Sequence, residues 1–541
     1  RKDYKNEIES PLNYYGNIDR QNFRINGDVK YISELSRFHF LPFIAMQNSK
    51  NDLTPIIEDL LVSWNEQNPY LKSINWTSGI EVGIRSVNLI YTHIVLKQTN
   101  KLTKEIDGII RELLLKKYHF LKNHLSLYSS ANNHLIGELL GLVSITNYFD
   151  KKSFSPNKWN QFFLKELLQQ VNEDGVNREL SSRYHAIITD HFLVGQEFIK
   201  RSGNILPENV ELRFRKMFSF INHSYYKGLT VNFGDSDDSH LIQPYFDKKY
   251  NIFQSLMQSS NFLFKSNFSS SRMDLRNYLI FGDAFEFISE ETTYRDKCFQ
   301  DSGYYFLYDK ELKVSFDVGK IGDDLLSAHG HSDLLHFTMS YGQSEFIVDP
   351  GTFQYHSSQK KWRNYFKDIS AHNTISINHL NHAQSNGRMG WKENPSTSVL
   401  DYALESKKPF VLAQHQAFKN EGIIHKRKIE LDKESNQLII SDNLICTKTL
   451  EEPVITTFYL HFHPLINVEK HEGEIKLTDT NNNSMLLKNN FFDKVEIVKA
   501  DEEKPLGWYS KSFDFKEPSY SLKAELNIDK NTSLITTIDY I

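Results

Sequence analysis

SAHGHSDLLHFTMSYGQSEFIVDPGTFQY, residues 327–355, contains two short candidate strands and side chains that could bind a metal. Apolar and polar residues alternate over 335–340, which is the period of a half-buried strand. A second apolar run, 346–348, ends at an Asp-Pro-Gly turn signal. If the two strands pair, the chain folds back on itself, and Asp349 can approach His331.

A third candidate ligand follows downstream. His372 stands just before another alternating run, 375–377. One carboxylate and two imidazoles on neighbouring strands are typical of a divalent metal site, here His331, Asp349 and His372. The alternative is that strand histidines only satisfy backbone groups, as we expect of His336. Spacing alone leaves both interpretations open.

Length and composition limit the classes of protein. A chain of 541 residues is too long for one ordinary core, so two or more domains are expected. Hydrophobic residues at 39% and charged residues at 24% are typical of a globular protein. The formal net charge of -5 argues against general nucleic-acid binding, so an anionic polymer would need a local basic surface.

Other classes are excluded by simple counts. Two cysteines, Cys298 and Cys446, stand too far apart for a zinc knuckle or a redox motif. No apolar run is long enough to span a bilayer. The sequence opens at Arg1 without an initiator methionine, which a removed signal peptide or a different starting point would explain. A signal peptide would make the protein periplasmic or secreted.

The first part of the chain shows the periodicity of helices. The segment 56–64 has apolar residues at helical spacing and ends before Asn68-Pro69. Residues 80, 84, 87 and 90 continue the same three- and four-residue steps. Short polar breaks between such segments favour antiparallel helix pairs. We therefore predict a helical domain over 1–285.

Composition changes near residue 300. Short apolar runs bounded by turn signals follow one another, which is typical of an antiparallel β-sandwich. We predict this domain over 286–541. Its candidate strands are 304–308, 314–318, 428–431, 438–440, 455–460 and 475–477.

Several segments, in this order, together resemble the heparinase II/III-like polysaccharide lyases, whose relatives include heparinase III and the oligoalginate lyases. The resemblance implies an incomplete (α/α) toroid followed by the β-sandwich, with a cleft between them. The segments are Asn75-Trp76 through Arg85, Asn132-Asn133-His134, Glu179 to His185, Phe233-Gly234-Asp235, the AHGHSD and FIVDPGTFQY pieces of 327–355, and AHNTISIN from Ala371.

The resemblance also implies the chemistry. These enzymes cleave uronic-acid polymers by β-elimination, which needs a group to neutralise the carboxylate, a base for the C5 proton and an acid for the leaving oxygen. Asn133 and His134 are expected to neutralise the carboxylate, although Asn132 or Asn133 could simply cap a helix. Tyr184 is the expected base, although on residue type alone it would be a core residue. His329 is the expected acid or second base.

The same resemblance implies ligand-binding residues. His331, Asp349 and His372 are expected to form a metal triad, most often for zinc. Expected contacts to an anionic polysaccharide are Trp76, Arg85, Tyr355 and Arg363. Arg85 could instead pair with Glu81 at i,i+4, and the basic run at 360–363 could be a solvated loop.

More than one function fits these residues. Oligoalginate lyases carry a further tyrosine before the AHNT-like segment. Tyr355 and Tyr365 are both nearby here but neither aligns with it directly, so the heparinase III-like side is slightly favoured. A metal-dependent glycan hydrolase would use the metal triad instead, and a non-catalytic glycan-binding protein would keep the fold without the chemistry. Near-ultraviolet absorbance of the products formed from a panel of uronate polymers would discriminate among these functions, because only β-elimination leaves a conjugated unsaturated uronate.

Overall fold

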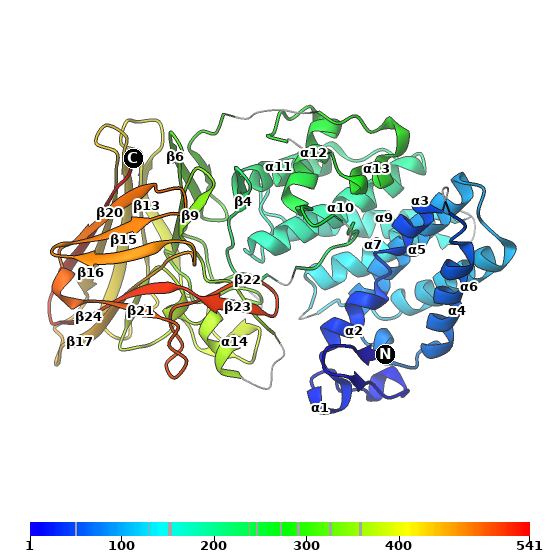
Figure 1. The fold of residues 1–541 in the computed structure, drawn as a ribbon, viewed down its shortest axis with the longest axis horizontal. Coiled ribbons are helices and arrows are strands. Elements are labelled where there is room, and N and C mark those ends of the chain that lie inside the picture. The colour runs from blue at the N-terminus through cyan, green and yellow to red at the C-terminus, as the bar shows by residue number, and fades with distance from the viewer. Residues whose placement is uncertain are drawn as a thin grey trace.

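The computed structural model describes residues 1–48, 51–128, 130–149, 154–236, 238–244, 247–270, 273–288, 293–323, 327–355 and 360–541. Helices make up the first part and strands the second (Figure 1). The helices of the first part are α1 (Phe23–Asn26), α2 (Val29–Ser36), α3 (Leu41–Gln47), α4 (Thr54–Gln67), α5 (Gly79–Gln98), α6 (Lys104–Leu121), α7 (Asn133–Tyr148), α9 (Pro156–Gln170), α10 (Ser182–Arg201), α11 (Glu208–Ser224), α12 (Ile252–Phe264) and α13 (Leu275–Phe281).

The centre of the helical part is the pair α5 and α7, which are apolar on nearly every face and buried along most of their length. Glycines allow the two helices to approach closely. A Cβ at Gly83 would lie 2.0 Å from the Gly137 carbonyl oxygen, and one at Gly141 would lie 2.7 Å from the Gly83 Cα. This contact fixes the start of α7, where Asn133 lies.

Among the described residues, the second part is built mainly of three larger antiparallel sheets. The first has the order β5 (Lys297–Phe299), β6 (Tyr304–Asp309), β7 (Leu312–Asp317), β8 (Phe337–Tyr341), β9 (Ser344–Ile347). The largest has the order β13 (Thr397–Ala403), β14 (Phe410–His415), β15 (Ile423–Asp432), β16 (Gln437–Cys446), β25 (Thr532–Asp539), β20 (Ser484–Asn489), β19 (Glu474–Thr478), β18 (Asn467–His471). The third has the order β10 (Ile375–Ile377), β17 (Val454–His461), β24 (Tyr520–Ile528), β21 (Val495–Lys499).

One hydrophobic core joins these sheets. Burial alternates along β15 and β16, so each strand turns one face inward, as in a sandwich. Val314 of β7, Ile440 of β16 and Leu522 of β24 belong to the same buried cluster. The predicted antiparallel sandwich is thus the observed architecture of the second part.

Smaller elements complete the chain. They are η1 (Tyr15–Asn17), η2 (Ile74–Trp76), η3 (Gly282–Ala284), α14 (Lys360–Lys367), η4 (Ile369–Ala371), η5 (Phe492–Lys494), and the two-stranded pairs β1 (Lys2–Asp3) with β2 (Ile8–Glu9), β3 (Tyr225–Tyr226) with β4 (Leu229–Thr230), β11 (Ser385–Asn386) with β12 (Gly390–Trp391), and β22 (Trp508–Ser512) with β23 (Phe515–Pro518).

The two parts meet through aromatic side chains. Phe220 and Phe233 of the helical part pack with Phe299, Tyr304 and Phe306 of the first sheet in one buried cluster. The Tyr304 hydroxyl also donates to the Leu180 carbonyl oxygen at 2.5 Å. The β22–β23 hairpin and α14 lie between the strands and the helices (Figure 1). This junction holds the ends of α7 and α10 close to the loops of the first sheet.

Most of the elements expected from periodicity are present. The segment 56–64 lies within α4, and 304–308 and 314–318 correspond to β6 and β7. The predicted boundary after residue 285 falls between η3 and β5. None of the described helices is both long and apolar enough to cross a membrane.

Candidate active site

Two aromatic residues predicted to act in catalysis are in contact although they come from different parts of the chain. The Tyr184 ring, in the first turn of α10, stacks on the His329 ring with centroids 3.8 Å apart and planes 24° apart. The hydroxyl oxygens of Tyr184 and Tyr355 lie 3.3 Å apart. The three side chains therefore form one polar and aromatic group at the junction of the two parts.

The backbone around His329 is held in an uncommon conformation. His329 has φ +68°, in the left-handed region that side chains other than glycine seldom adopt. Its carbonyl oxygen accepts the backbone N–H of Asp235 at 2.8 Å. A Cβ at Gly234 would stand 2.7 Å from that same oxygen, so only glycine allows this approach.

Asp235 connects the aromatic group with the candidate metal ligands. Its carboxylate lies 3.2 Å from His329 Nδ1 and 2.9 Å from His331 Nε2. Arg363 donates to both of its oxygens, at 2.5 and 2.8 Å. Burial alone would raise the pKa of Asp235, but Arg363 and the two histidines outweigh burial and hold it well below its usual range.

The helix cap expected at Asn132 or Asn133 is Asn132, so Asn133 has a different role. The cap of α7 is Asn132, whose side chain accepts the His134 backbone N–H at 3.2 Å. Asn133 is the first helical residue, and its Nδ2 donates to the two carboxylate oxygens of Glu179 at 2.9 and 3.2 Å. His134 follows it and is half-buried. Glu179 in turn lies 3.8 Å from His329 Nε2, so it connects Asn133 with the aromatic group.

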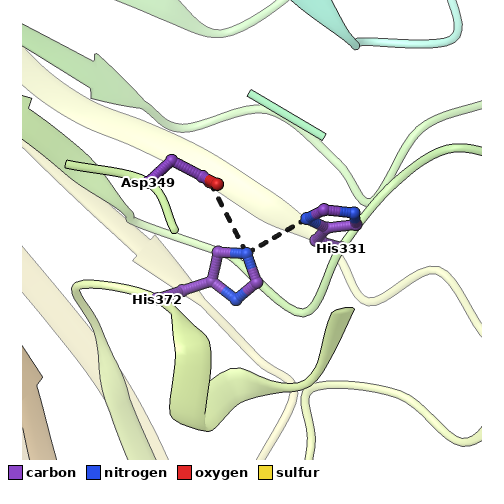
Figure 2. A group of neighbouring side chains, drawn as sticks. All are labelled: His331, Asp349 and His372. Carbon is purple, nitrogen blue, oxygen red and sulfur yellow. Dashed lines mark hydrogen bonds and ion pairs between the residues drawn. The ribbon is translucent and has the colours of Figure 1, made fainter. Parts of the chain in front are cut away.

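The three predicted metal ligands converge. His331, Asp349 and His372 come from three separate loops, and one ligand atom from each lies within 4.8 Å of the other two. Figure 2 shows the two imidazoles and the carboxylate pointing toward one another, with His372 between its two partners. His331 Nδ1 and His372 Nε2 are 3.2 Å apart, and Asp349 Oδ2 is 3.6 Å from His372 Nε2.

The hydrogen bonds on the outer side of this group fit a bound cation. His331 Nε2 faces Asp235, and His372 Nδ1 faces the Asp368 carbonyl oxygen at 2.9 Å, so each ring carries its proton on the outer nitrogen. His331 Nδ1 and His372 Nε2, which face each other, are therefore unprotonated and point their lone pairs at each other. A cation between them would turn two opposed acceptors into ligands, and outer carboxylate and carbonyl partners of this kind orient metal-binding histidines.

Burial sets the charge state of the group. It lowers the pKa of His331 and lowers that of His372 further, so both rings are neutral and able to ligate. It also raises the pKa of Asp349 well above the usual range. Asp349 Oδ2 is buried without a hydrogen-bond partner among the described residues. An uncompensated carboxylate oxygen and two neutral imidazoles suit a divalent cation.

His336 lies closer to this group than expected for an ordinary strand histidine. Its Nε2 is 3.7 Å from Asp349 Oδ2, just before β8. However, His336 Nδ1 accepts the Asn373 backbone N–H at 2.8 Å, which leaves the proton on Nε2. That nitrogen faces Asp349 as a donor, so His336 is not a fourth ligand in this arrangement.

Two of the expected substrate contacts are in the core instead. Trp76 and Arg85 are both fully buried at 0% exposure. The Trp76 indole N–H donates to the Asn68 carbonyl oxygen, and Arg85 donates to the Ser36 carbonyl oxygen at 2.5 Å. Glu81 is occupied by Arg37, at 2.6 and 2.7 Å. We therefore withdraw the assignment of Trp76 and Arg85 to substrate binding.

The basic run at 360–363 is the start of α14 rather than a solvated loop. Arg363 is buried, and its bonds to Asp235 occupy the guanidinium group. Its charge lies 5.2 Å from the centre of the Tyr355 ring, so Arg363 supports the site from behind rather than contacting sugar. Tyr365 lies in a separate buried cluster with Trp362. Tyr355 is therefore the tyrosine that reaches Tyr184.

Sequence reasoning missed two site residues, Glu179 and Asp235. Both stand in segments that carry the family resemblance, but neither has a distinctive spacing from the residues it binds. Asp235 is 94 residues from His329, and Glu179 is 46 residues from Asn133. A glycine followed by aspartate at 234–235 is the one local signal, and alone it is weak.

A polar cavity of about 500 Å³ lies next to the site, between the two parts of the chain. Ser182 and Arg183, which precede Tyr184, line it on the helical side. Asp349 and Thr352 line it on the side of the sheets. The cavity is thus lined by residues that neighbour Tyr184 in the sequence and by the metal ligand Asp349.

Solved structures share this architecture. A structure of heparinase III has a TM-score of 0.73 at 16% identity, covering 95% of this chain and 78% of that one. A heparan sulfate lyase from Pedobacter heparinus has a TM-score of 0.63 at 17% identity, covering 97% and 78%. These likenesses establish the fold, which is the expected (α/α) toroid followed by an antiparallel β-sandwich.

Sequence comparison agrees across both parts. A heparin-sulfate lyase of Bacteroides thetaiotaomicron is 21% identical over 289 residues, which cover 50% of this chain and 40% of that protein. The match therefore spans less than half of that relative's length. Residues 5–259 match the family model of the heparinase II/III N-terminus, and residues 291–535 match the heparinase II/III-like C-terminal model. The chain belongs to the heparinase II/III-like family.

Proposed function

We propose that this protein is a polysaccharide lyase that cleaves a uronic-acid-containing polymer of the glycosaminoglycan class by β-elimination. The observation that supports this most is the stacking of Tyr184 on His329 beside the Tyr355 hydroxyl. A phenol and an imidazole held together can remove and return protons. The names of the similar heparin and heparan sulfate lyases support the choice of polymer.

Tyr184 is the proposed base for the C5 proton. A phenol needs positive or hydrogen-bonding neighbours to act as a base near neutral pH, because its ordinary pKa is about 10. His329 stacks on its ring, and the Tyr355 hydroxyl lies within hydrogen-bonding distance of its oxygen. Glu179 and Asp235 face opposite nitrogens of His329, which favours a proton on both and so a positive charge beside Tyr184.

Asn133 and His134 are the proposed neutralisers of the uronate carboxylate. Asn133 Nδ2 faces both oxygens of the Glu179 carboxylate, which lie on the same side, so one N–H can be shared between them and the second N–H can reach a ligand. Both residues lie in the first turn of α7, where the helix dipole also favours an anion. Stabilising the enolate that forms when C5 loses its proton is the step that these donors would assist.

His331, Asp349 and His372 are the residues that would hold a divalent metal, with zinc as the ion that best suits two imidazoles and a carboxylate. A bound cation would fix the three loops and supply positive charge behind the site. A fixed His331 would hold the Asp235 carboxylate in place, and Asp235 in turn would hold His329. The proposed role of these ligands is therefore structural.

The burial of the metal group argues against a metal-dependent hydrolase. His331 and His372 are fully buried, and of the three ligands only Asp349, which is 3% exposed, borders the cavity, so a metal-bound water would have little access to a polymer. Alginate oligomers are a less favoured substrate. A purely glycan-binding role would not explain the contact of Tyr184 with His329. Because the proposed substrates are extracellular polymers, we also propose a periplasmic or secreted location.

A panel of uronate polymers tests this function. Heparan sulfate, heparin, chondroitin sulfate, hyaluronan and alginate are each incubated with the protein, and absorbance in the near ultraviolet is followed. Elimination leaves a conjugated unsaturated uronate, so absorbance should rise with at least one glycosaminoglycan. New reducing ends without absorbance would indicate hydrolysis, and binding without any product would indicate a glycan-binding protein.

A further inference from the structure

Glu179 is a buried carboxylate to which the proposed chemistry assigns no step. It lies in the loop before α10 and is 1% exposed. It accepts the Asn133 side-chain Nδ2–H, and its Oε1 also accepts the Asn133 backbone N–H at 3.0 Å. Its Oε2 lies 3.8 Å from His329 Nε2. One carboxylate thus contacts the proposed neutraliser and approaches the proposed acid, which come from opposite parts of the chain.

These contacts determine the orientation of the Asn133 amide. The nitrogen and oxygen of a carboxamide can exchange places by rotation about one bond, and only neighbouring groups decide which faces the site. An ionised carboxylate can only accept, so it holds the nitrogen of Asn133 on its own side. Burial raises the pKa of Glu179, while the nearby His329 ring and the N–H groups of Asn133 offset part of that effect.

A capping role alone would explain some of this. The Asn133 backbone N–H is one of the N–H groups that the start of an α-helix leaves without an intrahelical partner, and a carboxylate there also interacts favourably with the helix dipole. A cap does not account for the two side-chain contacts to Asn133 or for the approach to His329. The two roles predict different effects on catalysis.

We propose that Glu179 is a positioning residue that fixes the orientation of the Asn133 carboxamide relative to His329 across the junction. The proposal rests on the lyase function proposed above. Glutamine at this position keeps the size and one acceptor oxygen, so the backbone N–H of Asn133 remains capped. Its amide nitrogen, however, faces the amide nitrogen of Asn133, and two donors cannot bond to each other. Asn133 must then rotate and present its oxygen where its nitrogen stood.

The test compares Glu179→Gln, Asn133→Ala and the double variant with the wild type. We expect Glu179→Gln to lower kcat by about 10²-fold, as a small misplacement of a catalytic group does, with little change in KM. The double variant should lose less than the product of the two single losses, because Glu179 acts partly through Asn133 and partly through His329. Thr103→Ala is the matched control, since it removes the cap of α6 and should lower stability but not kcat.

Several outcomes would overturn the proposal. One is a kcat of Glu179→Gln within about threefold of the wild type. Another is a double variant whose loss of kcat equals the product of the two single losses. If Glu179→Gln lowered Tm but, like Thr103→Ala, left kcat unchanged, Glu179 would only be a helix cap. Failure of the lyase function is distinguishable, because the wild type itself would then form no unsaturated product.

Discussion

At the scale of single residues, the proposed chemistry depends on where the Asn133 amide donor is placed. Asn133→Ala removes the donor but leaves Asn132 to cap α7. We expect turnover to fall by about 10²–10³-fold, since a donor aimed at developing charge contributes about 3–4 kcal/mol to the transition state. Steady-state rates of unsaturated product formation, together with Tm, measure this.

Asn132→Ala is the control for that variant. It removes a helix cap, so it should cost about 1 kcal/mol of stability while turnover falls far less. If Asn133→Ala lost activity only in proportion to its loss of stability, the neutralising role would be refuted.

Residue type and order were enough to nominate some of these side chains but not others. Asn133, Tyr184 and His329 could be named because they stand in segments that resemble a known family. Glu179 and Asp235 contact residues that are distant in the sequence, and a single carboxylate in a loop does not indicate which partners it will have. Trp76 and Arg85 failed for the opposite reason: a residue type suited to sugar binding is equally suited to a core.

At the scale of elements, the β22–β23 hairpin connects the sheets with the first residues of the chain. Asp514, at its tip, accepts from the Tyr31 hydroxyl and the Gln354 side chain and forms an ion pair with Lys5. Phe513 packs its ring against Tyr355 at 5.5 Å. The hairpin therefore supports the tyrosine that neighbours Tyr184.

Asp514→Asn tests this connection. Loss of the charge should weaken the bonds to Tyr31 and Lys5, and hydrogen bonds to charged groups contribute about 1.5–3 kcal/mol. We expect faster hydrogen exchange in peptides from residues 1–36, with α10 unchanged, by mass spectrometry. Lys2→Ala, which breaks an exposed ion pair with Glu7 in the same segment, should have almost no effect. Equal exchange in Asp514→Asn and wild type would rule out the connection.

Periodicity predicted regular elements better than irregular ones. The alternation around Phe337 and the run at 346–348 predicted β8 and β9, which pair with Met339 opposite Ile347. The apolar repeat at 80, 84, 87 and 90 was also correct, since all four residues lie within α5. The helix α14 was missed because half of its sequence, KKWRNYFK, is basic. Its apolar face becomes evident only in the structure, where Trp362 and Phe366 share a buried cluster with Trp508 of the β22–β23 hairpin.

At the scale of the whole molecule, the proposed metal would bind ligands from three loops, those of His331, Asp349 and His372, and so hold these loops together. A cation that binds the folded protein and not the unfolded chain adds its binding free energy to stability. We expect near-stoichiometric metal by elemental analysis of the purified protein. His372→Ala should lower metal content and Tm together, and a chelator should lower the Tm of the wild type but not of this variant.

His461→Ala is the matched control for the metal prediction. His461 is equally buried, in β17, but bonds to Ser521 rather than to the metal group. Its loss should lower Tm by removing packing and leave metal content unchanged. A wild-type protein that is free of metal yet shows full stability and activity would contradict the metal proposal.

Tyr184→Phe tests the central claim most directly, because it removes one oxygen and keeps nearly all of the apolar volume. The measurement is the near-ultraviolet rate of unsaturated product formation on the polymer that the wild type cleaves, with polymer affinity and Tm measured on the same preparation. A positioned base contributes about 10²–10⁴-fold, so we predict a loss of at least 10²-fold with affinity and Tm retained. A variant that keeps more than about a tenth of wild-type turnover would contradict the assignment of Tyr184 as the base.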